Sequence, residues 1–256
     1  MFKCHFIIDK TKKNTKIRKK FFIKYKNYSI KSSNVIIVLG GDGFMLQTLK
    51  KYYKYNKPFY GINTGTFGFL MNRYEDNNLI KKISKAKQIS ISPLQMKALT
   101  KNRRMISAIA INEISLLRQT RQTACLQIFN GKKILIKKLI CDGILISTPA
   151  GSTAYNLSVG GPILSLNSNK LSVTPISPFR PRRWRGKLLS SSALIKIKNL
   201  DIQKRLVSAV ADNLEVRNVK VVSIKMNNSI KFRLLYDKNN SLSKKIRLEQ
   251  KYNGYF

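Results

Sequence analysis

The chain has 256 residues, 43% of them hydrophobic, which is enough for one large domain or two small ones. Lysine and arginine number 50 against 11 aspartates and glutamates, and the net charge of +39 attracts phosphate-bearing partners of any kind. The basic residues spread along nearly the whole chain without a zinc-finger, helix-turn-helix or RNA-recognition signature, so we expect only non-specific electrostatic binding of nucleic acid.

Other features of the composition exclude several classes of protein. No apolar run approaches the roughly 18 residues of a membrane span, and the first residues lack a signal-peptide core, so we predict a soluble cytoplasmic protein with no membrane partner. The three cysteines, Cys4, Cys125 and Cys141, are widely spaced, which disfavours a disulfide framework and a cysteine metal site. The only histidine is His5, so we do not expect a serine or cysteine nucleophile with a histidine base.

The first part of the chain alternates strand and helix patterns. A β-branched apolar run predicts a buried strand, and apolar residues at helical spacing predict a helix. The patterns predict, in order, a strand at Cys4–Ile8, a basic helix over 11–25, a strand over 35–39, a helix reaching Tyr55 and a strand over 58–63. Alternating strands and helices favour a parallel sheet, which binds ligands at the carboxyl ends of its strands.

A glycine-rich turn with one carboxylate follows the second of these strands. Its sequence is Gly40-Gly41-Asp42-Gly43. Three glycines let the backbone bend and come close to a bound group, and N–H groups at a helix N-terminus attract phosphate. Asp42 could accept a proton from an attacking hydroxyl or help to hold a metal, and an ordinary strand-to-helix turn is the alternative. The turn matches neither the Rossmann fingerprint nor the Walker A pattern.

The pattern changes near residue 89, after which short, closely spaced strands predict a mainly β domain. We therefore predict an α/β domain with a parallel sheet over 1–88, a β-rich domain over 89–240 and a closing helix in the tail 241–256. The strands predicted in the β-rich part cover 107–117, 124–129, 133–140, 144–147, 193–197, 206–211, 219–226 and 229–236.

One long segment of the second domain is rich in hydrogen-bonding groups. Residues 148–162 combine hydroxyls, an amide, a phenol and several small residues directly after the strand at 144–147. Such a segment suits a nucleotide. A turn rich in serine and glycine would explain any four of these residues, but it explains the whole run poorly.

Four motifs together resemble the NAD kinase family. They are Gly-Gly-Asp-Gly at 40–43, Gly-x-Asn-x-Gly-x-x-Gly-Phe-Leu at 61–70, Asn-Glu at 112–113, and Thr-Pro-x-Gly-Ser-Thr-Ala-Tyr-x-Leu-Ser-x-Gly-Gly-Pro-Ile at 148–163. The resemblance covers nearly the whole chain. It implies transfer of the γ-phosphoryl group of ATP to the 2′-hydroxyl of the adenosine ribose of NAD, with magnesium or another divalent cation carried by ATP and no separate protein metal site. It also implies a homodimer or homotetramer whose sites are completed across subunits.

The resemblance implies roles for residues in both domains. Asp42 is the implied group that orients or deprotonates the 2′-hydroxyl, and Gly43 lies beside it. The implied contacts with ATP phosphates are Gly40, Gly41, Gly43, Asn63 and Gly65. The implied contacts with NAD in the second domain are Asn112, Glu113, Asp142, Ala150, Thr153, Ala154, Tyr155, Asn156, Leu157, Ser158, Ser177 and Asn213. An amide can read a base edge, a carboxylate can accept from ribose hydroxyls, and a phenol ring can stack.

The chain departs from the family pattern at several positions. Phe44 stands where threonine is commoner, Thr64 where arginine is common, and Ala150 where serine or threonine often stands. These departures bear on the details of ATP and phosphate-donor binding more than on the type of reaction. The segment 175–185 also differs from the family and concentrates four arginines, Arg180, Arg182, Arg183 and Arg185. Either a solvated basic loop or a phosphate-binding loop explains them.

Two rival functions remain at this point. A lipid or sphingoid-base kinase of the related class shares the Gly-Gly-Asp-Gly turn and a β second domain, but it would not be expected to carry the segment 148–162. A nucleic-acid-binding protein on a decayed kinase fold would explain the charge. The intact residues Asp42, Asn112 and Asp142 argue against decay.

Overall fold

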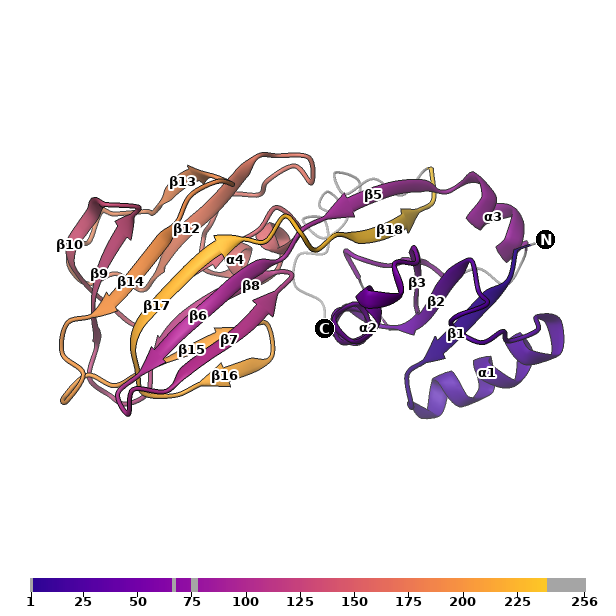
Figure 1. Cartoon of the computed structure of the whole chain (residues 1–256), viewed down its shortest axis with the longest axis horizontal. Helices are drawn as coiled ribbons and strands as arrows, with labels where there is room; N and C mark the ends of the chain where they lie inside the picture. Colours follow the sequence, from indigo (N-terminus) through magenta and orange to yellow (C-terminus); the bar gives the residue numbers. More distant parts are fainter. Residues whose placement is uncertain (1, 66–67, 75–77, 239–256) are drawn as a thin grey trace, which may run out of the picture. The chain divides into compact units, whose positions relative to one another are not determined.

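The computed structural model describes residues 2–65, 68–74 and 78–238, and the chain divides into two compact units (Figure 1). Unit 1 contains Met1–Ile91 together with the segment that begins at Ile230, and unit 2 contains Ser92–Ser229. In the part of the chain that is described, no helix is long and apolar enough to cross a membrane.

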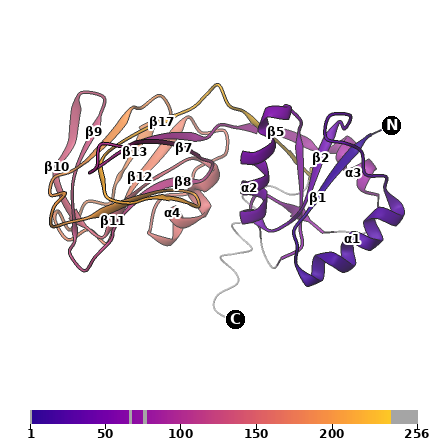
Figure 2. The same cartoon turned by 60° about the horizontal axis from the view of Figure 1, so that its bottom comes forward.

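Unit 1 is a mostly parallel sheet with helices on both faces (Figure 2). Its strand order is β1-β2-β3-β18-β5; the pairs from β1 to β18 are parallel, β5 pairs antiparallel with β18, and β4 is a short partner of β3. The elements are β1 Cys4–Ile8, α1 Lys12–Lys24, β2 Val35–Gly40, α2 Asp42–Tyr52, the 3-10 turn η1 Tyr53–Tyr55, β3 Phe59–Asn63, β4 Asn72–Arg73, α3 Leu79–Lys85, β5 Lys87–Ile91 and β18 Phe232–Tyr236.

The two faces of this sheet are covered by different helices. Alternate residues of β2 face opposite sides, and Val35, Ile37 and Leu39 pack in one cluster with residues of α1 and α3. On the other face, the ring of Tyr53, directly after α2, meets the ring of Phe232 edge-on at 5.9 Å between centroids. Burial on both faces explains why every residue of β2 is apolar or glycine, as expected of a central parallel strand.

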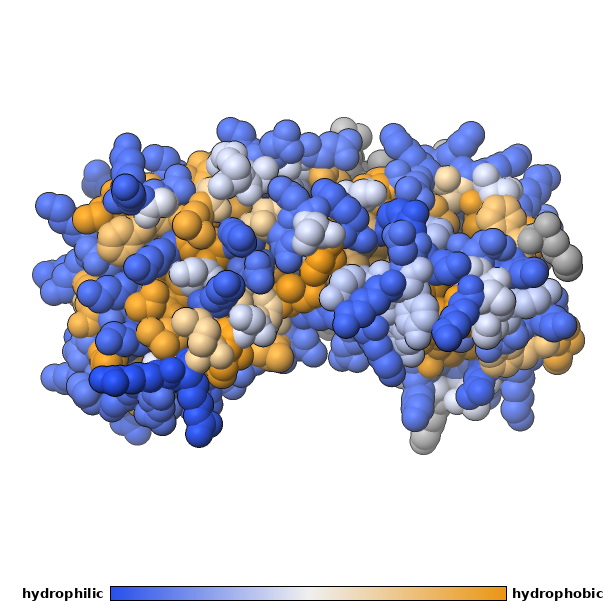
Figure 3. All heavy atoms as spheres, in the orientation of Figure 1, coloured by the Kyte–Doolittle hydropathy of each residue, from blue (hydrophilic) through white to orange (hydrophobic). Residues whose placement is uncertain are grey.

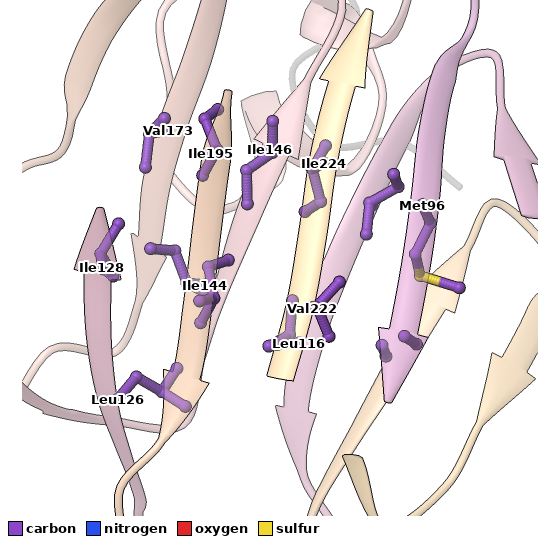
Figure 4. Close-up of a cluster of buried hydrophobic side chains, with 14 of the residues drawn as sticks. Met96, Leu116, Leu126, Ile128, Ile144, Ile146, Val173, Ile195, Val222 and Ile224 are labelled. Atoms are coloured by element: carbon purple, nitrogen blue, oxygen red, sulfur yellow. The ribbon is translucent and has the colours of Figure 1, made fainter. Parts of the chain in front are cut away.

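Unit 2 is a sandwich of two mainly antiparallel sheets. One sheet has the order β10-β9-β14-β17-β6-β7, and the other has the order β13-β12-β11-β8-β15-β16. Apolar side chains from both sheets, such as Met96 and Ile195 from the first and Leu116 and Ile144 from the second, form one buried core (Figure 4). The elements are β6 Leu94–Thr100, β7 Met105–Ala110, β8 Glu113–Arg118, β9 Ala124–Asn130, β10 Lys133–Cys141, β11 Gly143–Ser147, η2 Ala150–Thr153, α4 Tyr155–Ser158, β12 Lys170–Ile176, β13 Lys187–Ser190, β14 Ile195–Asn199, β15 Val207–Ala211, β16 Leu214–Val216 and β17 Val219–Met226.

The predicted fold class is confirmed, and two predicted strands differ from the structure. The domain boundary lies at Ile91, and β18, predicted within the β domain, lies between β3 and β5 in the sheet of unit 1. The predicted strand over 107–117 is wrong, because β7 and β8 belong to different sheets and the chain turns between them. The predicted closing helix over 241–256 lies outside the described residues.

The polarity of the surface and the state of the cysteines agree with what the composition predicts. Hydrophilic side chains cover much of the visible surface of both units (Figure 3), which agrees with lysines and arginines spread along the chain. The three cysteines are buried and free. Burial raises the pKa of Cys141 to about 12, so this thiol stays protonated and unreactive at neutral pH.

Candidate active site

In unit 1 the glycine-rich turn and the segment after β3 lie side by side at the carboxyl edge of the sheet. Gly40 at the end of β2 pairs with Asn63 at the end of β3, and the Thr64 N–H donates to the Gly40 carbonyl at 2.9 Å. The Asn63 side chain accepts from the Gly65 N–H at 2.9 Å, which fixes the bend after β3. The structure therefore brings together the residues predicted to contact donor phosphates.

The Asp42 carboxylate is held by backbone N–H groups. Phe69 donates to its Oδ2 atom at 2.7 Å, and Leu70 donates to its Oδ1 atom at 3.1 Å. Asp42 also opens α2, where a negative charge is stabilised by the partial positive charge of the helix N-terminus. These two bonds fix the orientation of the carboxylate, whose two oxygens offer about four lone-pair positions in all.

The glycines of this turn provide space rather than an unusual backbone conformation. Gly41 has a φ of −105°, and a side-chain carbon added at Gly41 or Gly43 would meet no atom within 4 Å. At Gly40 an added carbon would press on the ring of Phe44, which therefore closes one side of the turn. None of the three glycines has a positive φ, and the open space over Gly41 and Gly43 lets an anion approach the N-terminus of α2 closely.

Tyr236 near Asp42 was missed by sequence reasoning. Phe232 of β18 packs on the α2 side of the sheet, and residues two apart on a strand share a face, so Tyr236 lies on the face where α2 begins at Asp42. Burial, and secondarily the negative charge of Asp42, raises the pKa of Tyr236 above its ordinary value. The phenol is therefore neutral at pH 7. No local signal in β18 shows that it returns to the first sheet.

In unit 2 the Asn112-Glu113 pair lies on a turn built by Asp212. The Asp212 carboxylate accepts from the N–H groups of Ile111 at 2.8 Å, Asn112 at 2.9 Å and Glu113 at 3.4 Å. These bonds end β7 and start β8, which is why the predicted single strand is divided. Asn213, predicted to contact NAD, occupies the exposed β15–β16 turn beside Asp212.

The segment 148–162, which we call the cradle, packs directly on this turn. The Thr148 N–H donates to the Asn112 carbonyl at 2.9 Å, and its hydroxyl donates to the Ile111 carbonyl at 2.7 Å. Gly151 lies against the Asn112 backbone so closely that any side-chain carbon there would collide with the Asn112 carbonyl oxygen. Residues 112–113 and the cradle are therefore one structural unit.

Asn112 Oδ1 and Thr153 Oγ1 are buried oxygen atoms with no hydrogen-bond partner among the described residues. A buried polar atom without a partner costs about 1–3 kcal/mol, so native proteins rarely keep one without a function. Both residues belong to the predicted NAD contacts, and a ligand with hydrogen-bonding groups would satisfy both atoms.

Asn156, in contrast, is fully buried and has its side chain occupied by the protein. Its Nδ2 group donates to the Ser152 carbonyl at 3.3 Å and the Pro162 carbonyl at 3.0 Å. Its Oδ1 atom accepts from the Thr174 hydroxyl at 2.8 Å. Asn156 therefore joins two parts of the cradle to β12, and both its N–H donors and its oxygen are bonded inside the protein.

Thr174→Val should alter the cradle without removing any of its residues. The change leaves Asn156 Oδ1 without its donor, so we expect the free energy of unfolding to fall by about 1–3 kcal/mol. If the cradle binds NAD, the KM for NAD should rise several-fold while the KM for ATP stays constant. Thr174→Ser keeps the hydroxyl and is the control that should restore both values. An equal rise in both KM values would contradict a role limited to the cradle.

Asp142 and Ser177, also predicted to contact NAD, lie at the opposite end of the same sheet. The Asp142 N–H bonds to the carbonyl of Ile176, whose neighbour is Ser177, whereas the cradle follows the far end of β11. Five residues of strand separate the two ends, which is about 17 Å. Asp142 is also ion-paired with Arg118 at 2.5 Å. Within one chain, the predicted NAD residues therefore form two separate groups.

The described residues contain no group of three or more histidine, cysteine, aspartate or glutamate side chains that could hold a metal ion. Asp42 offers carboxylate oxygen, which is the donor that magnesium prefers, but one carboxylate is not a complete protein site. A magnesium ion brought by the phosphates of ATP would fit this donor set.

Comparisons with known proteins agree with this geometry. The ATP-NAD kinase N-terminal domain model matches residues 7–88, and the ATP-NAD kinase C-terminal domain model matches residues 111–232. The chain belongs to the NAD kinase family. The NAD kinase of Caulobacter vibrioides is 46% identical over 233 residues, covering 91% of this chain and 90% of that protein. The NAD kinase of Brucella suis is 43% identical over 246 residues, covering 96% of each chain.

Two solved structures have similar folds. A yeast NADH kinase complexed with NADH has a TM-score of 0.75 and 25% identity, covering 88% of this chain and 67% of that one. An NAD kinase from Archaeoglobus fulgidus in complex with ATP has a TM-score of 0.75 and 21% identity, covering 96% of this chain and 98% of that one. The second likeness bears on the fold alone. The two-unit architecture is therefore the architecture of NAD kinases.

Proposed function

We propose that this chain is an ATP-dependent NAD kinase. The observation that carries the proposal is Asp42, whose carboxylate is fixed by two N–H groups at the N-terminus of α2 beside two glycines with open space above them. That arrangement places a proton acceptor next to an anion-binding helix end, and phosphoryl transfer needs both. Family membership adds the identity of the substrates.

In the proposed reaction Asp42 accepts the proton of the adenosine ribose 2′-hydroxyl. The hydroxyl oxygen forms a bond to the γ-phosphorus of ATP while the bond between that phosphorus and the β–γ bridging oxygen breaks, which releases ADP and yields NADP. The N–H groups at the start of α2, together with Asn63 and Gly65, bind the phosphates. Magnesium brought with ATP would screen the phosphate charges, and the Asp42 carboxylate is a residue that could help to hold it.

On the acceptor side, we propose that the cradle binds NAD. Asn112 Oδ1 and Thr153 Oγ1 receive hydrogen bonds from the ligand, Glu113 accepts from ribose hydroxyls, and Tyr155, which is 37% exposed, stacks on a ring. The buried Asn156 positions the cradle through its three hydrogen bonds.

The direct test is a coupled assay of NADP formation from NAD, ATP and magnesium, with a dehydrogenase specific for NADP as reporter. Omission of ATP, of NAD or of the divalent cation should each abolish the signal. Replacing ATP with polyphosphate shows which phosphoryl donor the protein uses. Replacing NAD with NADH shows which phosphoryl acceptor it uses. Phosphorylation of a sphingoid base in place of NAD would contradict the proposal and support the related lipid-kinase class.

We also propose that the chain forms a homo-oligomer in which the Asp142 and Ser177 end of one copy completes the cradle of another. The support is the separation of about 17 Å between the two groups of predicted NAD residues in one chain. In a two-fold symmetric dimer, residue i of one copy can contact residue j of the other while j contacts i, so two separate regions of the chain can meet across the interface.

Mixing two defective variants should therefore restore activity. Asn112→Ala damages the cradle end, and Asp142→Asn damages the other end, so each variant alone should be poorly active. If the copies exchange ends, randomly mixed oligomers carry intact composite sites at roughly one quarter of positions. The measurement is NADP formation after coexpression of both variants, with separately purified variants as controls. Activity no higher than the average of the two separately purified variants would mean that each chain builds its own site.

A further inference from the structure

In unit 1, β18 loses β3 as its direct neighbour partway along the strand. Among the described residues, the two strands pair at Leu234 and Phe59. Further along β3, Ile62 and Asn63 pair instead with the short strand β4. The backbone groups of β18 beyond Leu234 therefore need another partner on this side, because buried peptide groups are almost always hydrogen-bonded.

The side chain of Asn72, the first residue of β4, supplies that partner. Its Nδ2 group donates to the Leu235 carbonyl at 2.9 Å, and its Oδ1 atom accepts from the Asp237 N–H at 3.0 Å. A residue of a parallel strand bonds in the same way to the residues before and after its partner, which here is Tyr236. Asn72 is fully buried, so its amide replaces a missing peptide group inside the sheet.

The chemistry of the amide explains why asparagine stands at this position. An amide carries a donor and an acceptor on one carbon, whereas a carboxylate only accepts and an ammonium group only donates. Glutamine carries the same amide on a side chain that is one carbon longer. An apolar side chain at position 72 would leave the Leu235 carbonyl and the Asp237 N–H without these bonds.

The residues directly before Asn72 hold the Asp42 carboxylate. Phe69 and Leu70 donate their N–H groups to its two oxygens, at 2.7 Å and 3.1 Å. Leu70 and Asn72 are two residues apart, and a chain of that length spans at most about 7 Å. The attachment to β18 and the two donors to Asp42 therefore belong to one short segment, residues 69–72.

Close packing leaves this segment little freedom to move independently of Asp42. A side-chain carbon added at Gly61 of β3 would collide with the sulfur of Met71. One added at Gly68 would lie 3.0 Å from Asp42 Oδ1 and 3.3 Å from Met71 Cγ. Because packed interiors transmit small displacements, a shift of β4 would displace the donors of the Asp42 carboxylate.

We propose that Asn72 is a positioning residue for phosphoryl transfer. By attaching residues 69–71 to β18, it keeps the two N–H donors aimed at the Asp42 carboxylate without itself contacting a substrate. The inference rests on the proposed role of Asp42 as proton acceptor. Misplacing a reacting group by about 1 Å can lower a rate about 100-fold, so a residue remote from the chemistry can control kcat.

The first test measures the hydrogen bonds of the segment and needs no enzyme activity. Asn72→Leu in the full chain keeps a similar volume but neither donates nor accepts. Amide hydrogen exchange at Phe69 and Leu70, followed by NMR, should become at least about tenfold faster in this variant. Exchange at Ile37 in the neighbouring strand β2 should not change.

The second test is kinetic and asks whether Asn72 acts through Asp42. In Asn72→Leu, kcat for NADP formation should fall about tenfold to a hundredfold, with the KM values for NAD and ATP within about threefold of the wild type. In an Asp42→Asn background, the same change should lower kcat by less than about a further threefold, because residues that act as a unit are not additive.

Asn199→Leu is the matched control. Asn199 is also buried, and its side chain likewise donates to one backbone group, the Arg205 carbonyl at 2.8 Å, and accepts from another, the Asp201 N–H at 3.1 Å. It lies in unit 2 and has no role in the proposed site. This variant should lose stability and should keep both kcat and the exchange at Phe69 and Leu70.

Asn72→Ser is the milder variant to use if the leucine variant does not fold, because a water molecule can bridge the shorter side chain to the same backbone groups. Both readouts should then move in the same direction by smaller factors. Wild-type exchange at Phe69 and Leu70 in a folded Asn72 variant would overturn the proposal, and so would equal kcat losses in the two backgrounds. A wild-type chain that makes no NADP would refute the proposed function instead, and the exchange measurement would still decide whether Asn72 fixes residues 69–70.

Discussion

Asp42→Asn should lower the rate of NADP formation by about 100-fold or more, the range expected for losing a positioned general base. The amide cannot accept a proton at neutral pH. The change also removes one of the hydrogen bonds that hold the side chain. The Asp42 carboxylate accepts from the N–H groups of both Phe69 and Leu70, and an amide can keep only one of these bonds. The measurement is kcat in the coupled assay together with the affinities for NAD and ATP from titration.

The affinities for NAD and ATP distinguish the loss of a general base from a displacement of residues 68–70, which are bonded to Asp42. Substrate affinities within a few-fold of the wild type, together with a large fall in kcat, would support the base assignment. Asp201→Asn is the charge-matched control: Asp201 pairs with Arg205 at 3.8 Å, accepts from the Lys204 N–H at 3.1 Å and has no role in the proposed site, so this variant should keep normal activity. A correctly folded Asp42→Asn protein with near-normal turnover would falsify the role proposed for Asp42.

Asn112→Ala should weaken NAD binding by about tenfold to a hundredfold, because a paired group in a buried site contributes about 1–3 kcal/mol. The same change removes an Oδ1 atom that is buried without a partner in the unliganded chain. We therefore expect the free energy of unfolding without ligand to stay constant or to rise. Calorimetric NAD titration and denaturant unfolding measure the two quantities independently.

Asn156→Ala provides the contrast for this prediction. It removes an amide with three hydrogen bonds to the protein, so both stability and NAD affinity should fall. Tyr155→Ala should weaken NAD with little loss of stability, because Tyr155 is 37% exposed. If Asn112→Ala lowers ATP affinity and leaves NAD affinity unchanged, the donor and acceptor sites have been exchanged in our assignment.

The sequence alone was sufficient for the fold class and for most local elements. Cys4–Ile8 and Val219–Met226 were predicted with the bounds that the structure shows, because apolar β-branched runs and turn residues are local signals. The helix after the glycine-rich turn was predicted because Phe44, Leu46 and Leu49 recur at helical spacing. The motifs at 40–43, 61–70, 112–113 and 148–163 together also identified the family, because they specify many residue types at fixed spacing.

Long-range pairing decided the rest. Nothing in the sequence of β18 shows that it lies between β3 and β5, because hydrogen bonds between distant strands leave no local pattern. In the same way, only the Asp212 side chain, about 100 residues away, explains why the chain turns at Asn112. The tertiary structure alone separated Asn112, which has an unsatisfied oxygen for a ligand, from Asn156, whose amide is occupied inside the protein. Identical residue types differ in function here because burial and hydrogen-bond partners depend on the folded surroundings.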